Sequence, residues 1–540
     1  MISGAEIMVK CLEAEGVDIV FGYPGAAICP FYDKVYDSSI THILVRQEQN
    51  AAHAASGYAR CSNRPGVCVA TSGPGATNLI TAIAPAYTDS IPIVAITGQV
   101  RSDLLGRDVF QEADITGACE PFVKHSYLVS KTEDLPRVFK EAFHIASTGR
   151  PGPVLIDIPV DIQENEIESF EYPESVNIIG YKPNTKGHAI QVKKAVEAIN
   201  ASKRPVIVSG GGVLSSGIKL KLQKFAETTG IPVISTMMGI GVMPSEHELY
   251  LGMLGTHGKA VANRALHEAD LVIVCGARLG DRAVAAPDQM SENTKVIQID
   301  IDPAEIGKNV KTEIPIVGDM KNVINMLLDS IGDYKVTTMW SETVKNWKKD
   351  LYREPPVFDG FVEPRTLVGH LSAMFRSKAI LVADVGQNQI WCANNFRIRE
   401  GRFLTTGGMG TMGYSIPAAI GAKFARPDRD VIVICGDGSF QMGLNELATI
   451  AGNQLGIKII IMKNARLGMV RELQDKHYGG RHSATILNGD PDFLKIADAY
   501  GIDHAEAHSN KEAENIIKGI VDSEKPFILV CDVHPDTPSI

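Results

Sequence analysis

The segment with the most specific chemistry begins at Val431 and reads Val-Ile-Val-Ile-Cys-Gly-Asp-Gly-Ser-Phe. The apolar run predicts a buried strand, and the glycines after it let the backbone approach a phosphate closely. Asp437, between those glycines, offers the hard oxygen ligand that Mg²⁺ prefers. A predicted helix over 445–451 and a second buried strand lead to Asn464 and Arg466, which can add an amide oxygen and a backbone carbonyl. The segment therefore predicts a Mg²⁺ and diphosphate site, whereas Gly-Asp-Gly alone would equally suit a capped turn.

This arrangement resembles the signature of thiamine diphosphate-dependent enzymes, in which Gly-Asp-Gly is followed after a fixed stretch by Asn-Asn. Lys463 stands where the first Asn is usual, and Asn464 keeps the second, which is the metal ligand in that family. The resemblance implies that thiamine diphosphate and Mg²⁺ bind here, with Asp437, Asn464 and the carbonyl of Arg466 as metal ligands. It also implies cofactor contacts from a further set of residues: Val385, Gly386, Gln387, Asn388, Gly410, Gly438, Ser439, Gly468, Met469 and Val470.

Thiamine chemistry needs two further side chains, a carboxylate at the aminopyrimidine ring and a bulky residue that keeps the cofactor bent. Glu48, in Arg-Gln-Glu-Gln, stands where the family has this carboxylate, although Gln47 replaces the usual His. Met412, in a glycine-rich stretch over 407–414, stands where the family has the bending residue. In this family the glutamate and the diphosphate site come from different subunits. The resemblance therefore implies a homodimer or homotetramer with shared active sites.

Two alternatives from other classes of protein stay open. The glycine-rich stretch also matches G-x-G-x-x-G, the pattern of dinucleotide-binding dehydrogenases. That match is weak, because Pro417 follows at once and no acidic residue stands about 20 positions on in the expected place. The second alternative is a catalytically silent relative that serves as a binding subunit, against which the intact Glu48, Met412, Asp437 and Asn464 argue.

The elements that must position these residues are short apolar runs that alternate with amphipathic stretches in three successive blocks. Such runs suit strands buried on both faces of a parallel sheet, with crossover helices between them. The predicted strands are 19–23, 67–71, 93–97 and 154–158 in the first block, 206–209, 233–235, 271–275 and 296–299 in the second, and 380–383, 431–435, 459–462 and 527–531 in the third. Polar, proline-containing stretches over 164–187 and 332–364 predict linkers.

We therefore predict an α/β protein of three open, doubly wound domains with mainly parallel sheets. The first domain, 1–165, would bind the thiamine pyrimidine. The second, 188–332, resembles an FAD-binding domain, and the third, 364–540, would bind the diphosphate and Mg²⁺. In such sheets ligands are expected at the carboxyl ends of the strands.

Composition excludes several classes of protein. The net charge of −10 leaves no basic excess for nucleic acid or an anionic membrane, and no apolar run reaches the roughly 18–20 residues that cross a bilayer. The amino-terminal residues show neither a signal-peptide nor a transit-peptide pattern. Nine scattered cysteines without a Cys-x-x-Cys pair suggest neither disulfides nor a zinc site. We expect a cytoplasmic enzyme.

The resemblance extends over essentially the whole chain and is closest to the acetohydroxyacid (acetolactate) synthases, with matches such as Phe-Gly-Tyr-Pro-Gly-Ala over 21–26, Thr-Ser-Gly-Pro-Gly-Ala-Thr-Asn over 71–78 and Gly-Met-Val over 468–470. It implies that pyruvate is decarboxylated and that its hydroxyethyl unit joins a second 2-oxo acid, in branched-chain amino acid biosynthesis. Pyruvate as acceptor gives 2-acetolactate, and 2-oxobutyrate gives 2-aceto-2-hydroxybutyrate. Gly25, Phe110 and Gln111 would line the reacting centre, where backbone N–H groups near Gly25 could stabilise an oxyanion.

Biosynthetic members of this family also hold FAD in the middle domain, and the catabolic branch does not. The family's Ala-Arg-Phe-Asp-Asp-Arg motif is present over 277–282 as Ala-Arg-Leu-Gly-Asp-Arg. The resemblance implies FAD contacts from these residues: Arg150, Gly211, Gly212, Thr236, Met237, His257, Asp281, Arg282 and Asp300. The alternative is that the middle domain is a vestigial nucleotide fold that binds no FAD. The protein would then be a catabolic FAD-independent acetolactate synthase, or another carboligase or decarboxylase of this cofactor class.

Two departures from the family concern specificity. Leu473 stands where a Trp usually favours 2-oxobutyrate, which predicts a weaker preference for that acceptor and weaker binding of sulfonylurea-type herbicides. Val160 stands where a Lys is usual near the channel entrance. The family also includes enzymes with a small regulatory subunit, so such a partner is a further expectation.

Overall fold

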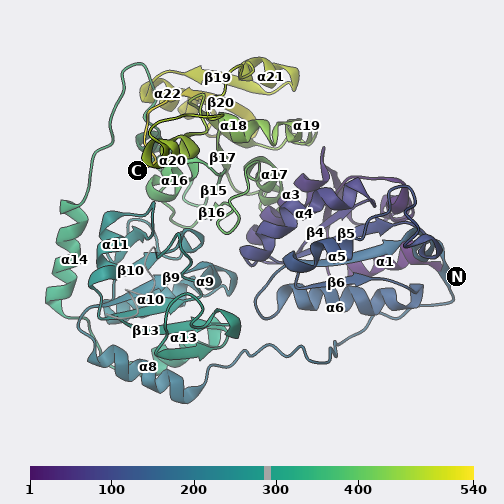
Figure 1. Ribbon diagram of the computed structural model, residues 1–540, viewed down its shortest axis with the longest axis horizontal. Coiled ribbons are helices and arrows are strands. Elements are labelled where there is room, and N and C mark those ends of the chain that lie inside the picture. Colours follow the sequence, from purple (N-terminus) through teal and green to yellow (C-terminus); the bar gives the residue numbers. More distant parts are fainter. Residues whose placement is uncertain (285–293) are drawn as a thin grey trace.

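The computed structural model describes residues 1–284 and 294–540 and contains three six-stranded sheets that follow one another along the chain. In each of these sheets the paired strands run parallel. Figure 1 shows the first sheet at the right in blue, the second at the lower left in teal, and the third at the top in green to yellow. The predicted α/β class with three mainly parallel sheets is confirmed.

The first sheet has a buried central part that is covered by helices on both faces. Its strands, in spatial order, are β3 (Thr41–Leu44), β2 (Ile19–Gly22), β4 (Gly66–Ala70), β5 (Ile93–Gln99), β7 (Val154–Pro159) and β6 (His125–Leu128). Its helices are α1 (Gly4–Ala14), α2 (Cys29–Tyr36), α3 (Glu48–Ser62), α4 (Pro74–Thr88), α5 (Ile115–Cys119), α6 (Leu135–Ser147) and α7 (Val160–Glu164). A short antiparallel pair, β1 (Ile2–Ser3) with β8 (Glu166–Ile167), joins the two ends of this part of the chain.

The second sheet is also covered on both faces, with apolar cores on each side. Its strands, in spatial order, are β11 (Tyr250–Met253), β10 (Val233–Ser235), β9 (Pro205–Ser209), β12 (Leu271–Cys275), β13 (Lys295–Asp300) and β14 (Ile314–Val317). Its helices are α8 (Ala189–Ala201), α9 (Gly211–Ser215), α10 (Lys219–Thr229), α11 (Ala260–Glu268), α13 (Met320–Ser330) and α14 (Thr338–Asp350).

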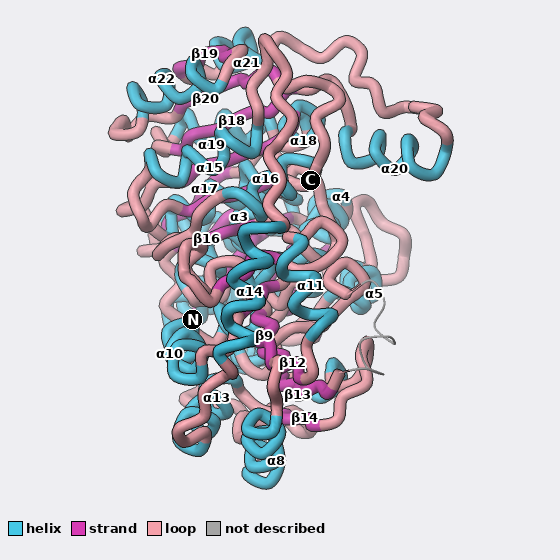
Figure 2. Tube along the Cα trace, turned by 90° about the vertical axis from the view of Figure 1, so that its left-hand side faces the viewer, coloured by secondary structure: helices cyan, strands magenta, loops and turns pink. Residues whose placement is uncertain are grey.

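The third sheet carries the Gly-Asp-Gly segment at the end of a central strand. Its strands, in spatial order, are β16 (Arg402–Leu404), β15 (Ile380–Ala383), β17 (Val431–Gly436), β18 (Ile457–Lys463), β20 (Phe527–Asp532) and β19 (Asp503–Ala507). Its helices are α15 (Pro364–Met374), α16 (Gln387–Asn395), α17 (Ser415–Ala425), α18 (Asp437–Gln441), α19 (Leu447–Gly452), α20 (Gly468–Tyr478), α21 (Phe493–Ala499) and α22 (Asn510–Ile520). In Figure 2, α20 stands out from the rest of the molecule.

The structure differs from the sequence prediction at two places around the third domain. The helix predicted over 445–451 is preceded by α18, which begins directly at Asp437, and is itself split into a 3₁₀ turn (Leu444–Glu446) and α19. The stretch predicted as a linker over 332–364 contains α14, which packs on the second domain. Trp340 and Val344 are buried there, and the Trp340 indole N–H donates to the Pro205 carbonyl at 3.1 Å.

The first and third domains share one apolar core, which is formed where α3 lies along α17. The two helices approach so closely that a Cβ at Gly57 would stand 2.0 Å from the Ala418 carbonyl oxygen, and one at Gly421 would stand 1.8 Å from that of Ala54. Only glycine fits at these two positions. The close packing places the start of α3, and therefore Glu48, against the third domain of the same chain.

None of the helices in the described ranges is long and apolar enough to cross a membrane. All nine cysteines are free thiols, and all except Cys29 are buried. The eight buried cysteines therefore act as small apolar side chains in the domain cores.

Candidate functional site

Backbone N–H groups surround the carboxylate of Asp437. Strands β17 and β18 lie side by side with Gly436 opposite Met462, so the residues after the two strands meet. One Asp437 carboxylate oxygen accepts from the N–H groups of Asn464 (2.9 Å) and Ala465 (2.6 Å), and the other accepts from that of Gly438 (2.9 Å). Ala465 has φ of +53°, a strained conformation that turns its N–H onto the carboxylate.

Burial raises the pKa of Asp437 to about 6, and the N–H group of Ala465 opposes this rise. The side chain is only 1% exposed. A carboxylate has about four lone-pair sites, and three N–H donors leave one for a cation. The Asn464 amide oxygen accepts from the Arg466 N–H at 3.1 Å and likewise keeps a lone pair. This donor set fits Mg²⁺, which takes carboxylate and carbonyl oxygens.

Gln387 connects the two sides of this half of the site. Its amide oxygen accepts from the Asn464 side chain at 3.0 Å, and its amide N–H group donates to Glu472 on α20 and to the Thr537 carbonyl, both at 2.8 Å. A Cβ at Gly468 would stand 1.8 Å from the Gln387 amide oxygen, so α20 can begin here only with glycine. The predicted site residues that follow β15, follow β18 and begin α20 thus lie together.

Met412 lies over the Gly-Asp-Gly turn. Its methyl carbon is 3.8 Å from the position that a Cβ on Gly438 would take. A Cβ on Gly410 would meet nothing nearer than Val385, at 4.0 Å, so this wall of the site is open. Ser439 faces away from the opening, because its hydroxyl bonds the Gly436 backbone. Met469 and Val470 follow on the first turn of α20, where Val470 is exposed.

Glu48 is the first residue of α3 and lies in a small polar cluster of the first domain. The Asn78 amide donates to its carboxylate at 2.9 Å, and the other carboxylate oxygen lies 3.4 Å from where a Cβ on Gly75 would stand. A Cβ on Gly25 would collide with Thr71, at 2.5 Å. The loops after β2, β3 and β4 therefore bring Gly25, Glu48 and Thr71 to the same edge of the first sheet.

The loop over 101–114 carries the other two predicted residues of the reacting centre. Gln111 has φ of +60° and packs against Gly73, where a Cβ would stand 2.9 Å from the Gln111 Cα. Phe110, next to it, is 87% exposed. The structure thus places Gln111 beside the loop of Thr71, while the Phe110 side chain points into solvent.

Comparison with known proteins identifies the family. Three thiamine pyrophosphate enzyme models match the chain: the N-terminal TPP binding domain over residues 2–118, the central domain over 192–327 and the C-terminal TPP binding domain over 384–531. A probable acetolactate synthase large subunit of Methanocaldococcus jannaschii is 47% identical over 99% of this chain and 92% of its own. The acetolactate synthase large subunits of Haemophilus influenzae and Lactococcus lactis are 44% and 42% identical, over 93% and 98% of this chain and 89% and 92% of theirs.

The chain belongs to the acetolactate synthase large-subunit family of thiamine pyrophosphate enzymes. In this family member the residues predicted for FAD gather mostly at the carboxyl edge of the second sheet. Gly211 and Gly212 follow β9, Thr236 and Met237 follow β10, and Asp300 ends β13. Burial raises the pKa of Asp300 to about 6.

The other predicted FAD residues surround this edge. Arg150 comes from the first domain and donates to Glu305, at 2.8 Å, and to Ser90, also at 2.8 Å. The backbone of Arg282 lies against Thr256, whose N–H donates to its carbonyl at 3.0 Å, and burial lowers the pKa of the neighbouring His257. The side chains of Asp281 and Arg282 are exposed and pair only with each other in the described residues, at 3.6 Å.

Sequence reasoning missed two buried carboxylates that hold the site together. Asp384, directly after β15, accepts from the N–H groups of Val385 (2.9 Å), Gly413 (3.0 Å) and Ser415 (2.8 Å), so it joins two cofactor segments. Burial raises its pKa to about 6. Its position at the end of a predicted strand was a usable signal.

Glu446 is the second of these carboxylates and joins the two domains that carry the site. It is fully buried and accepts from the Arg46 N–H at 2.7 Å, the Asn50 amide at 2.9 Å and the Thr449 hydroxyl at 2.6 Å. Arg46 and Asn50 flank Glu48 in sequence. The contact therefore fixes the start of α3 relative to the third domain, although the partners lie 400 residues apart.

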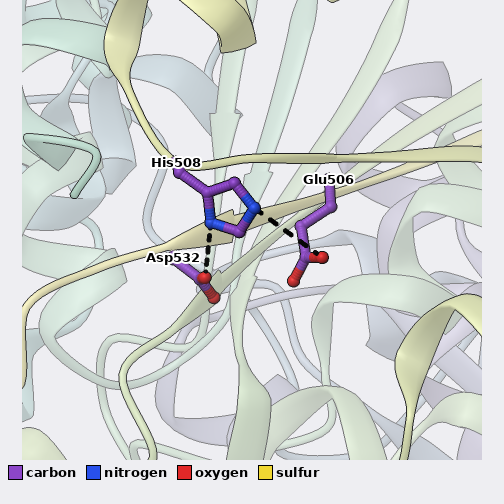
Figure 3. Close-up of side chains that lie close together, drawn as sticks. All are labelled: Glu506, His508 and Asp532. Atoms are coloured by element: carbon purple, nitrogen blue, oxygen red, sulfur yellow. Dashed lines mark hydrogen bonds and ion pairs between the residues drawn. The ribbon is translucent and has the colours of Figure 1, made fainter. Parts of the chain in front are cut away.

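Lys463, the departure from the family motif, belongs to an ionic cluster that we call the Lys463 network: Lys463, Glu506, His508 and Asp532. Lys463 lies 3.3 Å from Asp532 and 3.6 Å from Glu506. Figure 3 shows the other three residues, in which the His508 ring lies 2.8 Å from Asp532. The carboxylate and imidazole atoms lie within 4.8 Å of one another, a spacing that could hold a metal ion. The lysine ammonium already supplies a positive charge there. We conclude that this network links the ends of β18, β19 and β20 beside Asn464.

Proposed function

We propose that this chain is the catalytic subunit of an acetolactate synthase. It decarboxylates pyruvate and joins the remaining two-carbon unit to a second pyruvate or to 2-oxobutyrate, in branched-chain amino acid biosynthesis. The observation that supports the proposal is that the chain carries two separate half-sites, each at the carboxyl edge of a sheet. Asp437 and Asn464 offer oxygens for a divalent cation, and Glu48, beside Asn78, offers a carboxylate at the edge of another sheet.

Bound thiamine diphosphate supplies the electron sink that decarboxylation of a 2-oxo acid requires. We assign to Asp437 and Asn464 the binding of Mg²⁺, and to Arg466 a carbonyl ligand. Glu48 holds a proton at the pyrimidine ring, and the Asn78 amide keeps its carboxylate oriented. Gly25 packs on Thr71, and we assign to its neighbouring backbone N–H groups the stabilisation of the oxyanion.

The oligomeric state, the partners and the compartment belong to the same proposal. We infer a homodimer or homotetramer in which the Glu48 half-site of one subunit faces the Met412 half-site of another. The relatives are called large subunits, which supports a small regulatory partner. We also propose that the enzyme acts in the cytoplasm.

FAD is the second proposed cofactor, bound at the carboxyl edge of the second sheet. The arrangement of Gly211, Gly212, Thr236 and Asp300 at neighbouring strand ends supports a dinucleotide there. Met238, beside the predicted contact Met237, packs on Gly407 of the third domain, where a Cβ would stand 2.6 Å from its sulfur. A flavin at this edge would thus adjoin the thiamine site.

The test is to incubate the purified protein with pyruvate, thiamine diphosphate and Mg²⁺, with and without FAD, and to assay acetolactate as acetoin after acidification. Product that depends on FAD supports the biosynthetic enzyme, and product without it supports the catabolic branch. Glu48→Gln should lose at least about 10²-fold in kcat, the contribution of one proton-transfer group, and keep cofactor binding. Asp437→Ala should lose Mg²⁺-dependent cofactor binding in a fluorescence titration. If wild-type protein yields no acetolactate, the proposed donor or acceptor is wrong.

A further inference from the structure

A cavity of about 230 Å³ lies where all three domains meet. The first domain lines it with the end of α3, the second with the turn before α10, and the third with the starts of β15 and β16. These strand starts are at the amino edge of the third sheet, whereas Asp437 lies at the carboxyl edge. None of the residues predicted to contact thiamine diphosphate, Mg²⁺ or FAD lines it. The cavity is therefore separate from the site described above.

Positive charge dominates the lining of this cavity. Four cationic side chains face it, and one carboxylate does: Lys219, Arg402, Arg426, Arg429 and Glu400. Glu400 pairs with Lys378, outside the lining, at 3.7 Å. Asp428 pairs with Arg426 at 2.9 Å and reaches Arg429 only at 4.0 Å. Arg426 is thus the only cation of the lining with a close carboxylate partner among the described residues, and Glu400 acts on Lys219 and Arg429 from a greater distance.

Lys219 and Arg402 are the two cations whose charge is not matched. Within the described parts of the chain, no carboxylate oxygen lies within 4 Å of either one. The Arg402 guanidinium donates to the Asn63 side-chain oxygen at 2.9 Å, a neutral acceptor. The Arg429 Nε is buried and has no hydrogen-bond partner among the described residues. Lys219 and Arg402 are partly buried, and charges that are removed from water are normally paired, so this group of cations suits an anionic ligand.

The electrostatics of the group support the same conclusion. Burial lowers the pKa of Arg402, and the neighbouring Arg60, Arg429 and Arg426 lower it further. Burial also lowers the pKa of Lys219, and Arg402 adds to that effect. The cations therefore repel one another across the cavity. An anion between them would relieve this repulsion.

Helix ends account for only part of the charge. Helices α3 and α17 both end at the cavity, with Asn63 and Arg426 as their C-terminal cap residues. A helix C-terminus carries the equivalent of about half a negative charge. Two such ends offset about one positive charge, and they lie close to Asn63 and Arg426 rather than to Lys219. The cations thus exceed what helix capping requires.

We propose that this cavity binds a phosphate dianion, either the free ion or the phosphate group of a small metabolite. Two unmatched cations balance a dianion, and the forked donors of arginine match phosphate oxygens in pairs. The volume of about 230 Å³ exceeds one phosphate group but is smaller than the usual 300–1,000 Å³ of pockets for drug-sized ligands. Because every domain contributes a wall, the bound anion holds the three domains in one arrangement.

The experiment uses the protein saturated with thiamine diphosphate, Mg²⁺ and FAD, so that those sites cannot take the probe. Inorganic phosphate and glycerol 3-phosphate are titrated by calorimetry in phosphate-free buffer at fixed ionic strength. We expect saturable binding at one site per chain and a rise in melting temperature with probe concentration. Similar affinities for the two probes would assign the free ion, and glycerol 3-phosphate binding tenfold tighter would assign a phosphorylated metabolite.

Arg402→Gln should weaken binding at least about tenfold, as the loss of one charge-assisted hydrogen bond does. Lys219→Met, at the first residue of α10, provides a second test that leaves Arg402 and its bond to Asn63 in place. Arg353→Gln, an exposed cation outside the cavity, is the matched control and should bind as wild type. The proposal is overturned by the absence of saturable binding, by unchanged affinity in both cavity variants, or by chloride competing equally with phosphate.

Discussion

The bond network of Glu446 makes the sharpest prediction about how the site is assembled. Replacing Glu446 by Ala removes the only carboxylate that joins the start of α3 to the third domain within the described contacts. It leaves three donors without their acceptor: the Arg46 N–H, the Asn50 amide and the Thr449 hydroxyl. Glu48 follows Arg46 by two residues, so its position should suffer as well.

The magnitude follows from what each donor can do afterwards. A buried donor without a partner costs about 1–3 kcal/mol. The Thr449 hydroxyl can still donate to the Leu44 carbonyl, which is 3.1 Å away, and the Asn50 amide lies 3.4 Å from the Asn445 side-chain oxygen. The Arg46 N–H has no such second acceptor among the described residues. The unpaired Arg46 N–H costs about 1–3 kcal/mol, and the weakened Asn50 and Thr449 bonds cost about 0.5–1 kcal/mol each. We therefore expect Glu446→Ala to lower the free energy of unfolding by about 2–5 kcal/mol, and Glu446→Gln, which keeps one acceptor oxygen, by about 1–2 kcal/mol.

The assay is urea unfolding at fixed protein concentration, followed by circular dichroism, with the thiamine diphosphate affinity measured on the same samples. Glu342→Ala, an exposed carboxylate on α14, should stay within about 0.5 kcal/mol of wild type. Without urea, the rate of acetolactate formation by Glu446→Ala should fall by more than the fraction of protein that is unfolded. If Glu446→Ala unfolds like Glu342→Ala, the carboxylate does not join the domains and the reasoning is refuted.

Three further predictions follow from the same structure. Burial raises the pKa of Asp157 to about 7, above the unfolded value of about 3.9. Its contribution to stability is therefore complete below pH 4 and is lost as the pH rises through 7. Asp157→Asn should remove up to about 4 kcal/mol of this pH dependence, measured by unfolding from pH 4 to 8. Lys463→Met empties the centre of the Lys463 network, so Zn²⁺ should raise the melting temperature of the variant and leave that of the wild type unchanged. Leu473 is 50% exposed on α20, and Leu473→Trp should shift mixed-substrate products toward 2-aceto-2-hydroxybutyrate; an unchanged product ratio would contradict the role assigned to this position.

The central strands of all three sheets could be predicted from the sequence because they are buried on both faces. Runs such as Val431–Gly436 and Ile457–Lys463 are continuously apolar, which is the pattern of a strand inside a parallel sheet. The six edge strands were missed: β3, β6, β11, β14, β16 and β19. His125–Leu128 and Asp503–Ala507 are short, mixed in polarity and partly exposed, so nothing in their pattern separates them from loops.

The candidate site divides in a similar way. Residues that would touch a ligand, such as Asp437 and Asn464, follow apolar strands and carry side chains whose chemistry points to a metal. Residues that hold those segments in place carry no such signal. Glu446 reads in the sequence as an ordinary acid in a helical stretch, because the donors that it accepts from lie 396 and 400 residues away.

The three buried carboxylates of the site share one physical role, and this explains why the site needs them. Asp384, Asp437 and Glu446 each accept backbone N–H groups from segments that end or begin a helix or strand. Such loops leave N–H groups unpaired. Asp384 and Asp437 each satisfy three of them, and Glu446 satisfies one backbone N–H and two side-chain donors. Asp384 thereby fixes the Met412 segment, Asp437 fixes the loop of Asn464, and Glu446 fixes the start of α3. The buried acidic groups of the site thus hold its loops in place in addition to any chemical role. Replacing any one of the three by its amide should loosen one loop before it unfolds the domain.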